Sequence, residues 1–153
     1  MNYTDAKKEF EHYLDGYDRN NDKVRLKIIH TYGVVHDMED ICRRMNLSLE
    51  DTELAKIIAL LHDIGRAEQY RSGIPHDEAG AQIAEQILRD LSFDPSEIQK
   101  ITSAILEHRN AARSDTLSSL IYDADKASRN CFSCPAEKEC YWSAEKKNLT
   151  ITY

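Results

Sequence analysis

The sequence contains little glycine and proline, few alternating runs of β-branched residues, and no long apolar segment. Only 5 Gly and 3 Pro occur in 153 residues. So few turn residues argue against a protein of many short strands, because the connections between strands commonly use them. No apolar stretch approaches the ~18 residues that a membrane-spanning helix needs. We therefore expect an all-α fold and no membrane partner.

Acidic residues outnumber basic ones, with 27 Asp and Glu against 20 Lys and Arg, so the net charge is −7 and the pI is about 5.3. An acidic chain is poorly suited to follow a nucleic-acid backbone, so we expect no extended nucleic acid as a partner. A local basic cluster can still bind one phosphate. The first residues, MNYTDAKKEFEHY, are polar and charged and do not resemble a signal peptide. We expect a cytoplasmic protein, in which structural disulfides are rare.

Apolar residues recur at helical spacing along most of the chain. Val24, Ile28, Val35, Met38 and Cys42 are separated by three, four or seven residues and stack on one helical face. The periodicity predicts helices over about residues 3–16, 22–45, 48–63, 75–91, 94–109 and 116–128, with a loop over 66–73. We predict a single domain over residues 1–153, an all-α bundle of five to seven helices.

Three of these helices begin with recognisable start signals. Thr4 is the expected N-cap of the first. Ser48 has an acidic residue, Asp51, three positions later, as in a capping box. Asp94 precedes Pro95, which suits the first helical position.

The pair His62-Asp63 directly follows the apolar run IIALL of residues 57–61, and Gly65 is expected to end that helix. Neighbouring helical residues point ~100° apart, but their side chains can converge on one cation between them. Imidazole nitrogen and carboxylate oxygen together suit Mn, Fe, Zn or, less well, Mg. Two ligands do not make a site, so other helices must supply more.

His30 and one aspartate of DADK are the further candidates. His30 lies in mid-helix among apolar residues, and Asp123 and Asp125 follow another apolar run. A lone inward histidine is more often a core residue, so only the joint pattern indicates a metal site. Two histidines and two aspartates leave one or two positions for water and substrate, as a catalytic metal requires. Composition alone does not separate Asp123 from Asp125.

The order His30, His62-Asp63, Asp125 resembles the H…HD…D signature of the HD-domain metal-dependent phosphohydrolases. Five segments over about residues 20–130 are similar to elements of that family, in the same order: IIHTYGVV, LLHDIGR, PHDEAGAQIAEQIL, ITSAILEHR and DADKAS. The last segment resembles the family's final element in a way that favours Asp125 over Asp123.

This resemblance implies a helical bundle that binds one divalent ion, of which Mn, Fe, Zn, Co, Ni and Mg are all candidates, through His30, His62, Asp63 and Asp125. It also implies hydrolysis of phosphate esters, often of nucleotides. His76 and His108 correspond to positions that hold a second metal in some branches. A mononuclear site is favoured, with these two histidines facing the substrate or supporting the ligands.

The residues near the signature allow a mechanism. Asp63 is both a ligand and the expected proton acceptor, and Glu68 is another candidate base. Arg66, Lys126 and Arg129 are cations near the motif that could neutralise phosphate charge in the transition state. His36 lies ~240° around the helix from His30, and His12 has no motif around it, so both are left out of the site.

Cys131, Cys134 and Cys140 form a separate motif within the C-terminal segment of about residues 131–153. A CxxC pair presents two thiolates at the separation that zinc needs, and an iron–sulfur cluster is the alternative. The fourth ligand would be Cys42 or a histidine. The alternative is that these cysteines bind no metal and are reduced thiols.

Three functions follow from these patterns. The first is a phosphohydrolase for a small phosphorylated metabolite or nucleotide: a phosphomonoesterase, nucleotidase or phosphodiesterase. The second is a non-catalytic regulatory or redox-sensing module that works through the cysteines, and the third is a dinuclear oxygenase or phosphodiesterase. A small phosphorylated substrate is the expected partner, and a homodimer is a further hypothesis.

Overall fold

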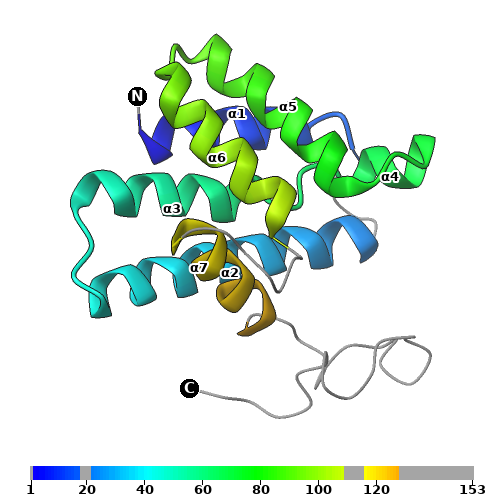
Figure 1. Cartoon of the computed structure of the whole chain (residues 1–153). Helices are drawn as coiled ribbons and strands as arrows, with labels where there is room; N and C mark the ends of the chain where they lie inside the picture. Colours follow the sequence, from blue (N-terminus) through cyan, green and yellow to red (C-terminus); the bar gives the residue numbers. More distant parts are fainter. Residues whose placement is uncertain (1, 18–21, 109–115, 128–153) are drawn as a thin grey trace.

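The computed structural model describes residues 2–17, 22–108 and 116–127, which form seven α-helices and no strand (Figure 1). The predicted all-α class is confirmed. Cys131, Cys134, Cys140 and Arg129 lie outside the described residues. Among the described helices, none is long and apolar enough to cross a membrane. The helices are α1 (Tyr3–Leu14), α2 (Asp22–Arg44), α3 (Leu49–Leu61), α4 (Arg66–Ser72), α5 (His76–Asp90), α6 (Pro95–Glu107) and α7 (Thr116–Ala127).

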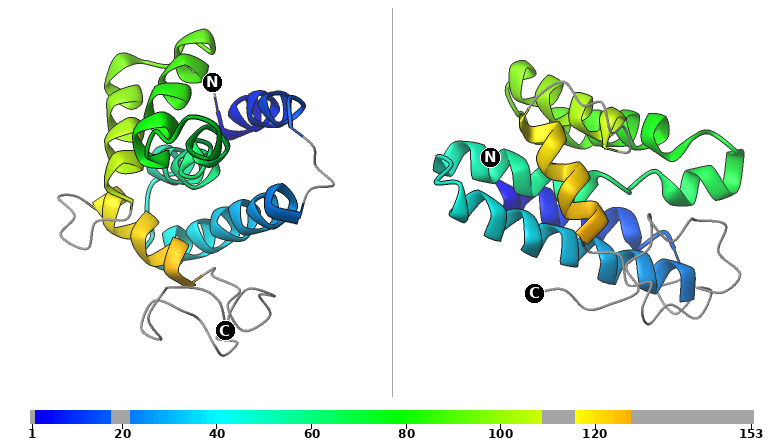
Figure 2. Two further views of the ribbon diagram at one scale, coloured as in Figure 1. Left: turned by 90° about the vertical axis from the view of Figure 1, so that its right-hand side faces the viewer. Right: turned by 60° about the horizontal axis from the view of Figure 1, so that its bottom comes forward.

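Helix α3 lies in the middle of the bundle (Figure 2). Its second half, Ile57–Leu61, is buried on every side, as expected for a helix that is apolar all round. It contacts α1, α2, α6 and α7, while α5 packs on α6 and α4 packs on α5. The residues that directly follow α3 therefore enter the interior of the protein.

The helix starts agree in part with the predictions. Ser48 caps α3 as expected, because its Oγ accepts a hydrogen bond from the Asp51 amide at 3.1 Å. Asp94 occupies the N-cap position of α6, but its carboxylate accepts a bond from the Ser96 hydroxyl at 2.6 Å. Thr4 was the wrong cap for α1. Asn2 forms a reciprocal capping box with Asp5 instead.

The predicted loop over residues 66–73 was wrong, because Arg66–Ser72 form α4. Gly65 is the N-cap of this helix, and α3 already ends at Leu61, so Gly65 does not terminate α3 as expected. Gly73 ends α4 with a left-handed φ of 80°. Seven residues are too few to display an apolar period, and none of them is buried. The helix is defined instead by its two flanking glycines and by its packing on α5.

Candidate metal centre

Four of the predicted ligands meet at one point of the bundle. His30 comes from α2, Asp125 from α7, and His62-Asp63 from the end of α3, and their ligand atoms lie within 4.8 Å of one another. Asp125 Oδ1 is 2.7 Å from His30 Nε2 and 3.3 Å from His62 Nε2. Asp125 is buried whereas Asp123 is exposed. The structure thus places Asp125, and not Asp123, with the histidines.

His76 and His108 form a second group on the other side of Asp63. Each histidine has its Nε2 atom 3.6 Å from Asp63 Oδ1, and both side chains are buried. Asp63 Oδ2 faces the first group, at 3.5 Å from His62 Nε2 and 3.8 Å from His30 Nε2. One carboxylate is therefore shared between two sets of ligand atoms.

Hydrogen bonds from their Nδ1 atoms orient three of the histidines. Nδ1 of His62 donates to the Ala59 carbonyl at 2.6 Å, and Nδ1 of His108 donates to the Ile105 carbonyl at 2.6 Å. Nδ1 of His76 donates to Gln69 Oε1 at 2.9 Å. Because these oxygens only accept, each Nδ1 carries a proton, and each Nε2 is the atom that faces the carboxylates, where it can donate a hydrogen bond when protonated or bind a cation when not.

The ligand atoms of the second group are suited to a bound cation. His76 Nε2 lies 3.2 Å from His108 Nε2, and both atoms face a carboxylate oxygen. Two nitrogen lone pairs and an anionic oxygen repel one another at such distances unless a proton or a metal ion lies between them. Imidazole and carboxylate ligands together suit a divalent transition metal.

The buried aspartates and His62 shift one another's pKa values. Burial alone would raise the pKa of Asp63, but His62, a hydrogen bond from His108, Lys27 and Arg66 hold it well below its usual range. Burial would also raise the pKa of Asp125, but hydrogen bonds from His30 and His62 hold it well below its usual range. Burial would lower the pKa of His62, but Asp63 and Asp125 outweigh it and raise that pKa. The site thus favours bound positive charge.

Metal binding should therefore strengthen as the pH rises. In metal-free protein, the contribution of protonated His62 to stability is fully present below about pH 6.5. It is lost as the pH rises through the raised pKa of His62 in the folded state. Asp63 and Asp125 contribute above about pH 4 and lose their contribution in acid. Since metal ligands must be deprotonated, the gain in melting temperature from added Mn²⁺ should grow from pH 6 to pH 8. Thermal melts with Mn²⁺ or with chelator measure it; a gain that shrinks over this range would contradict a histidine site.

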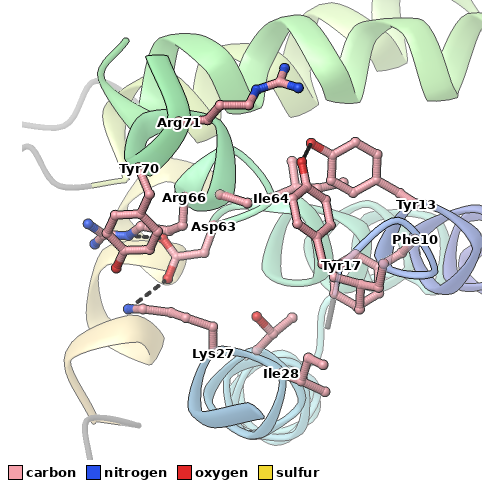
Figure 3. Close-up of a pocket in the computed structure, with 13 residues that line it drawn as sticks. Phe10, Tyr13, Tyr17, Lys27, Ile28, Asp63, Ile64, Arg66, Tyr70 and Arg71 are labelled. Carbon is pink, nitrogen blue, oxygen red and sulfur yellow. Dashed lines mark hydrogen bonds and ion pairs between the residues drawn. The ribbon is translucent and has the colours of Figure 1, made fainter. Parts of the chain in front are cut away.

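Two cations lie beside Asp63. Arg66 Nε is 3.4 Å from Asp63 Oδ1, and Lys27 Nζ is 3.7 Å from Oδ2 (Figure 3). Arg66 was expected here, but Lys27 was missed, because it is one of several basic residues on a long amphipathic helix. Lys126 is exposed on α7, and Glu68 accepts a hydrogen bond from Arg71 on α4. Glu68 thus pairs within α4, and the catalytic roles of Glu68 and Lys126 stay predictions from sequence.

Gln69 was also missed, because it lies in the segment interpreted as a loop. Its Oε1 accepts from both Nδ1 and the backbone amide of His76, at 2.9 and 3.0 Å. Gln69→Leu should weaken divalent-metal affinity by about 10- to 100-fold, since it removes the bond that orients His76 toward the ligand Asp63. Gln69→Glu keeps an acceptor and should stay near wild type. Competition with a fluorescent chelator measures the affinity; exposed Gln82 on α5 supplies the control Gln82→Leu, and equal losses in both leucine variants would refute the role.

The remaining candidates lie elsewhere. His12 and His36 are exposed, in agreement with their omission from the site. Cys42 is fully buried in the core, and burial raises the pKa of its thiol. A raised pKa disfavours the thiolate that zinc would need.

Comparison with known proteins agrees with this geometry. Residues 28–130 match the HD domain family. An uncharacterized protein from Clostridium beijerinckii is 38% identical over 120 residues, which is 76% of each chain. Ribonuclease Y 1 from Pediococcus pentosaceus is 32% identical over 92 residues, which is 50% of this chain but 18% of the ribonuclease. The crystal structure of a predicted HD superfamily hydrolase from an uncultured Thermotogales bacterium superposes with a TM-score of 0.68 and 25% identity, over 93% of this chain and 81% of that chain. The chain belongs to the HD-domain family.

Proposed function

We propose that the protein is a metal-dependent phosphohydrolase that acts on a small phosphorylated metabolite or nucleotide. The observation that carries this proposal is the buried Asp63 carboxylate, which faces two groups of ligand atoms and two cations at once. Membership of the HD-domain family supports it, as does the similarity to a predicted hydrolase.

His30, His62, Asp63 and Asp125 would hold a divalent ion. When bound, such an ion supplies Lewis acidity toward a phosphoryl oxygen and lowers the pKa of water. Lys27 and Arg66 lie where they can neutralise charge that develops on the phosphate. Asp63 stays ionised near neutral pH because its pKa is low, so it can accept a hydrogen bond from the attacking water.

Hydrolysis of phosphodiesters is the second candidate function. The group of Asp63, His76 and His108 favours it, because these residues would hold a second divalent ion, and a second ion would add stabilisation of the leaving oxygen of a diester. The ribonuclease relative, although matched over a small share of its length, is named for cleaving a phosphodiester polymer. The net charge of −7 favours a small substrate over a long RNA.

Elemental analysis and a substrate panel test both candidates. The purified protein should retain at least one divalent transition metal per chain and should hydrolyse p-nitrophenyl phosphate. Two metals per chain with a preference for bis-p-nitrophenyl phosphate would favour the diester function. If metal-loaded protein hydrolyses neither compound nor any phosphorylated metabolite in the panel, the proposed function is wrong. The cysteine-based sensing role, cytoplasmic location and homodimer stay predictions from sequence.

A further inference from the structure

A cavity of about 550 Å³ opens directly beside Asp63 (Figure 3). This volume lies within the roughly 300–1,000 Å³ that is typical of small-molecule sites. Its walls come from α1 and Tyr17 just beyond it, from α2, from the turn after α3, and from α4. Because Asp63 belongs to the metal centre and to the cavity wall, a molecule in the cavity can reach the reacting position.

The end of the cavity beside the metal centre is charged. Lys27 and Arg66 both contact Asp63, and Figure 3 shows all three at the same end, with Tyr70 next to them. This end offers two cations beside the candidate metal ligands, and it suits a phosphate group.

The other end is apolar and aromatic. Phe10, Tyr13 and Tyr17 gather there, at a distance from the charged end in Figure 3. The hydroxyls of Tyr13 and Tyr17 lie 3.1 Å apart and hydrogen-bond to each other. Apart from this bonded pair and the Arg71 side chain, the walls present mainly ring faces and aliphatic groups, including Leu14 and Ile28.

The aromatic wall comes from a part of the chain that precedes the family match. Phe10, Tyr13, Leu14 and Tyr17 all lie before residue 28, where the match to the HD domain begins. Lys27 also lies before it. The matched domain thus supplies the metal ligands, and residues that precede it supply much of the surface against which the substrate's organic part would rest.

We propose that α1 and Tyr17 form the subsite for the organic group, and that the substrate is a phosphate ester whose organic part carries a flat aromatic ring. This inference rests on the proposed function. Phosphate would sit at the charged end, beside Lys27 and Arg66, and the ring would lie against Tyr13 and Tyr17. Ring faces favour stacked or edge-on contact with another ring, whereas an acyclic polyol would find few partners for its hydroxyls along a wall that is made mainly of rings and aliphatic groups.

Two non-hydrolysable probes test the subsite without catalysis. Benzylphosphonate and methylphosphonate share the anionic group and differ in the ring, so calorimetric titration of the Mn²⁺-loaded protein measures what the ring adds. Wild type should bind benzylphosphonate at least about tenfold more tightly. Tyr17→Ala should lose most of this preference, and Tyr17→Phe, which keeps the ring, should retain it.

A second cavity variant and a surface control distinguish loss of the subsite from loss of the fold. Leu14→Trp, which fills the apolar end, should also lower affinity for benzylphosphonate while leaving that for methylphosphonate unchanged. His12→Ala changes an exposed residue of the same helix and should behave as wild type. Circular dichroism and thermal melting check that each variant folds.

The outcomes separate this inference from the proposed function. Equal affinity of wild type for both probes, or an undiminished preference in folded Tyr17→Ala and Leu14→Trp, would overturn the subsite even if the protein hydrolyses phosphate esters. A ring preference that these variants remove supports the subsite. If the same protein hydrolyses no ester, the function fails while the binding site stands.

Discussion

Asp63→Asn is expected to lower kcat/KM for phosphate esters by on the order of 1,000-fold or more, and to release the bound metal. Asparagine has the same shape but no charge. The substitution therefore removes the anion that lies within 4 Å of four imidazole nitrogens and two cations. Among the described residues, Asp63 is the carboxylate that belongs to both groups of ligand atoms, so Asp125 cannot replace it. Steady-state kinetics and elemental analysis of the same preparation measure the two losses.

Asp123→Asn is the matched control, since it removes one negative charge from an exposed position two residues before Asp125. It should keep both activity and metal. Circular dichroism should show that Asp63→Asn remains folded. A folded Asp63→Asn protein with wild-type activity would contradict the assignment of the reaction to this site.

Gly65→Ala is expected to destabilise the protein by about 3 kcal/mol or more, through overpacking. A Cβ atom at Gly65 would lie 2.2 Å from the His76 carbonyl oxygen and 2.4 Å from the Gly80 nitrogen. Both are backbone atoms, so the clash is relieved only if α5 moves away from the turn that carries Asp63. Such a movement would also displace His76 from Asp63. Urea denaturation measures the stability, and metal affinity reports the displacement.

Gly80→Ala supplies a control at the same contact. A Cβ atom there would lie 3.4 Å from the Gly65 nitrogen and 3.6 Å from Ile105, which is ordinary contact. Alanine also favours the helix by up to about 1 kcal/mol, so stability should stay within about 1 kcal/mol of wild type. If both variants are equally stable, then α5 does not pack as closely on the turn as the structure indicates.

Much of the fold and of the ligand set could be predicted from the sequence because their signals are local. Helical periodicity, the Ser48 cap and the Asp94-Pro95 start of α6 depend on residues within a few positions of each other. His62-Asp63 follows an apolar run that is buried wherever the helix lies, so the interior position of the pair was predictable.

Other features depend on contacts that no local pattern contains. Helix α4 is too short to show an apolar period, so its residues were predicted to form a loop. For that reason Gln69, whose partner His76 is seven residues away, was not considered as a site residue. Lys27 contacts Asp63 from a different helix. The sequence favoured a single metal, with His76 and His108 in supporting positions, whereas the structure brings their Nε2 atoms to the same carboxylate. Convergence of α5 and α6 on one atom is a result of packing.

Anomalous X-ray diffraction from crystals of the active protein tests the central claim most directly. Data collected on both sides of the absorption edge of the metal found by elemental analysis locate that metal without reference to activity. We predict a peak within bonding distance of His30, His62, Asp63 and Asp125; a second peak beside His76 and His108 would assign the dinuclear form. An active protein whose crystals show no metal at Asp63 would contradict the account.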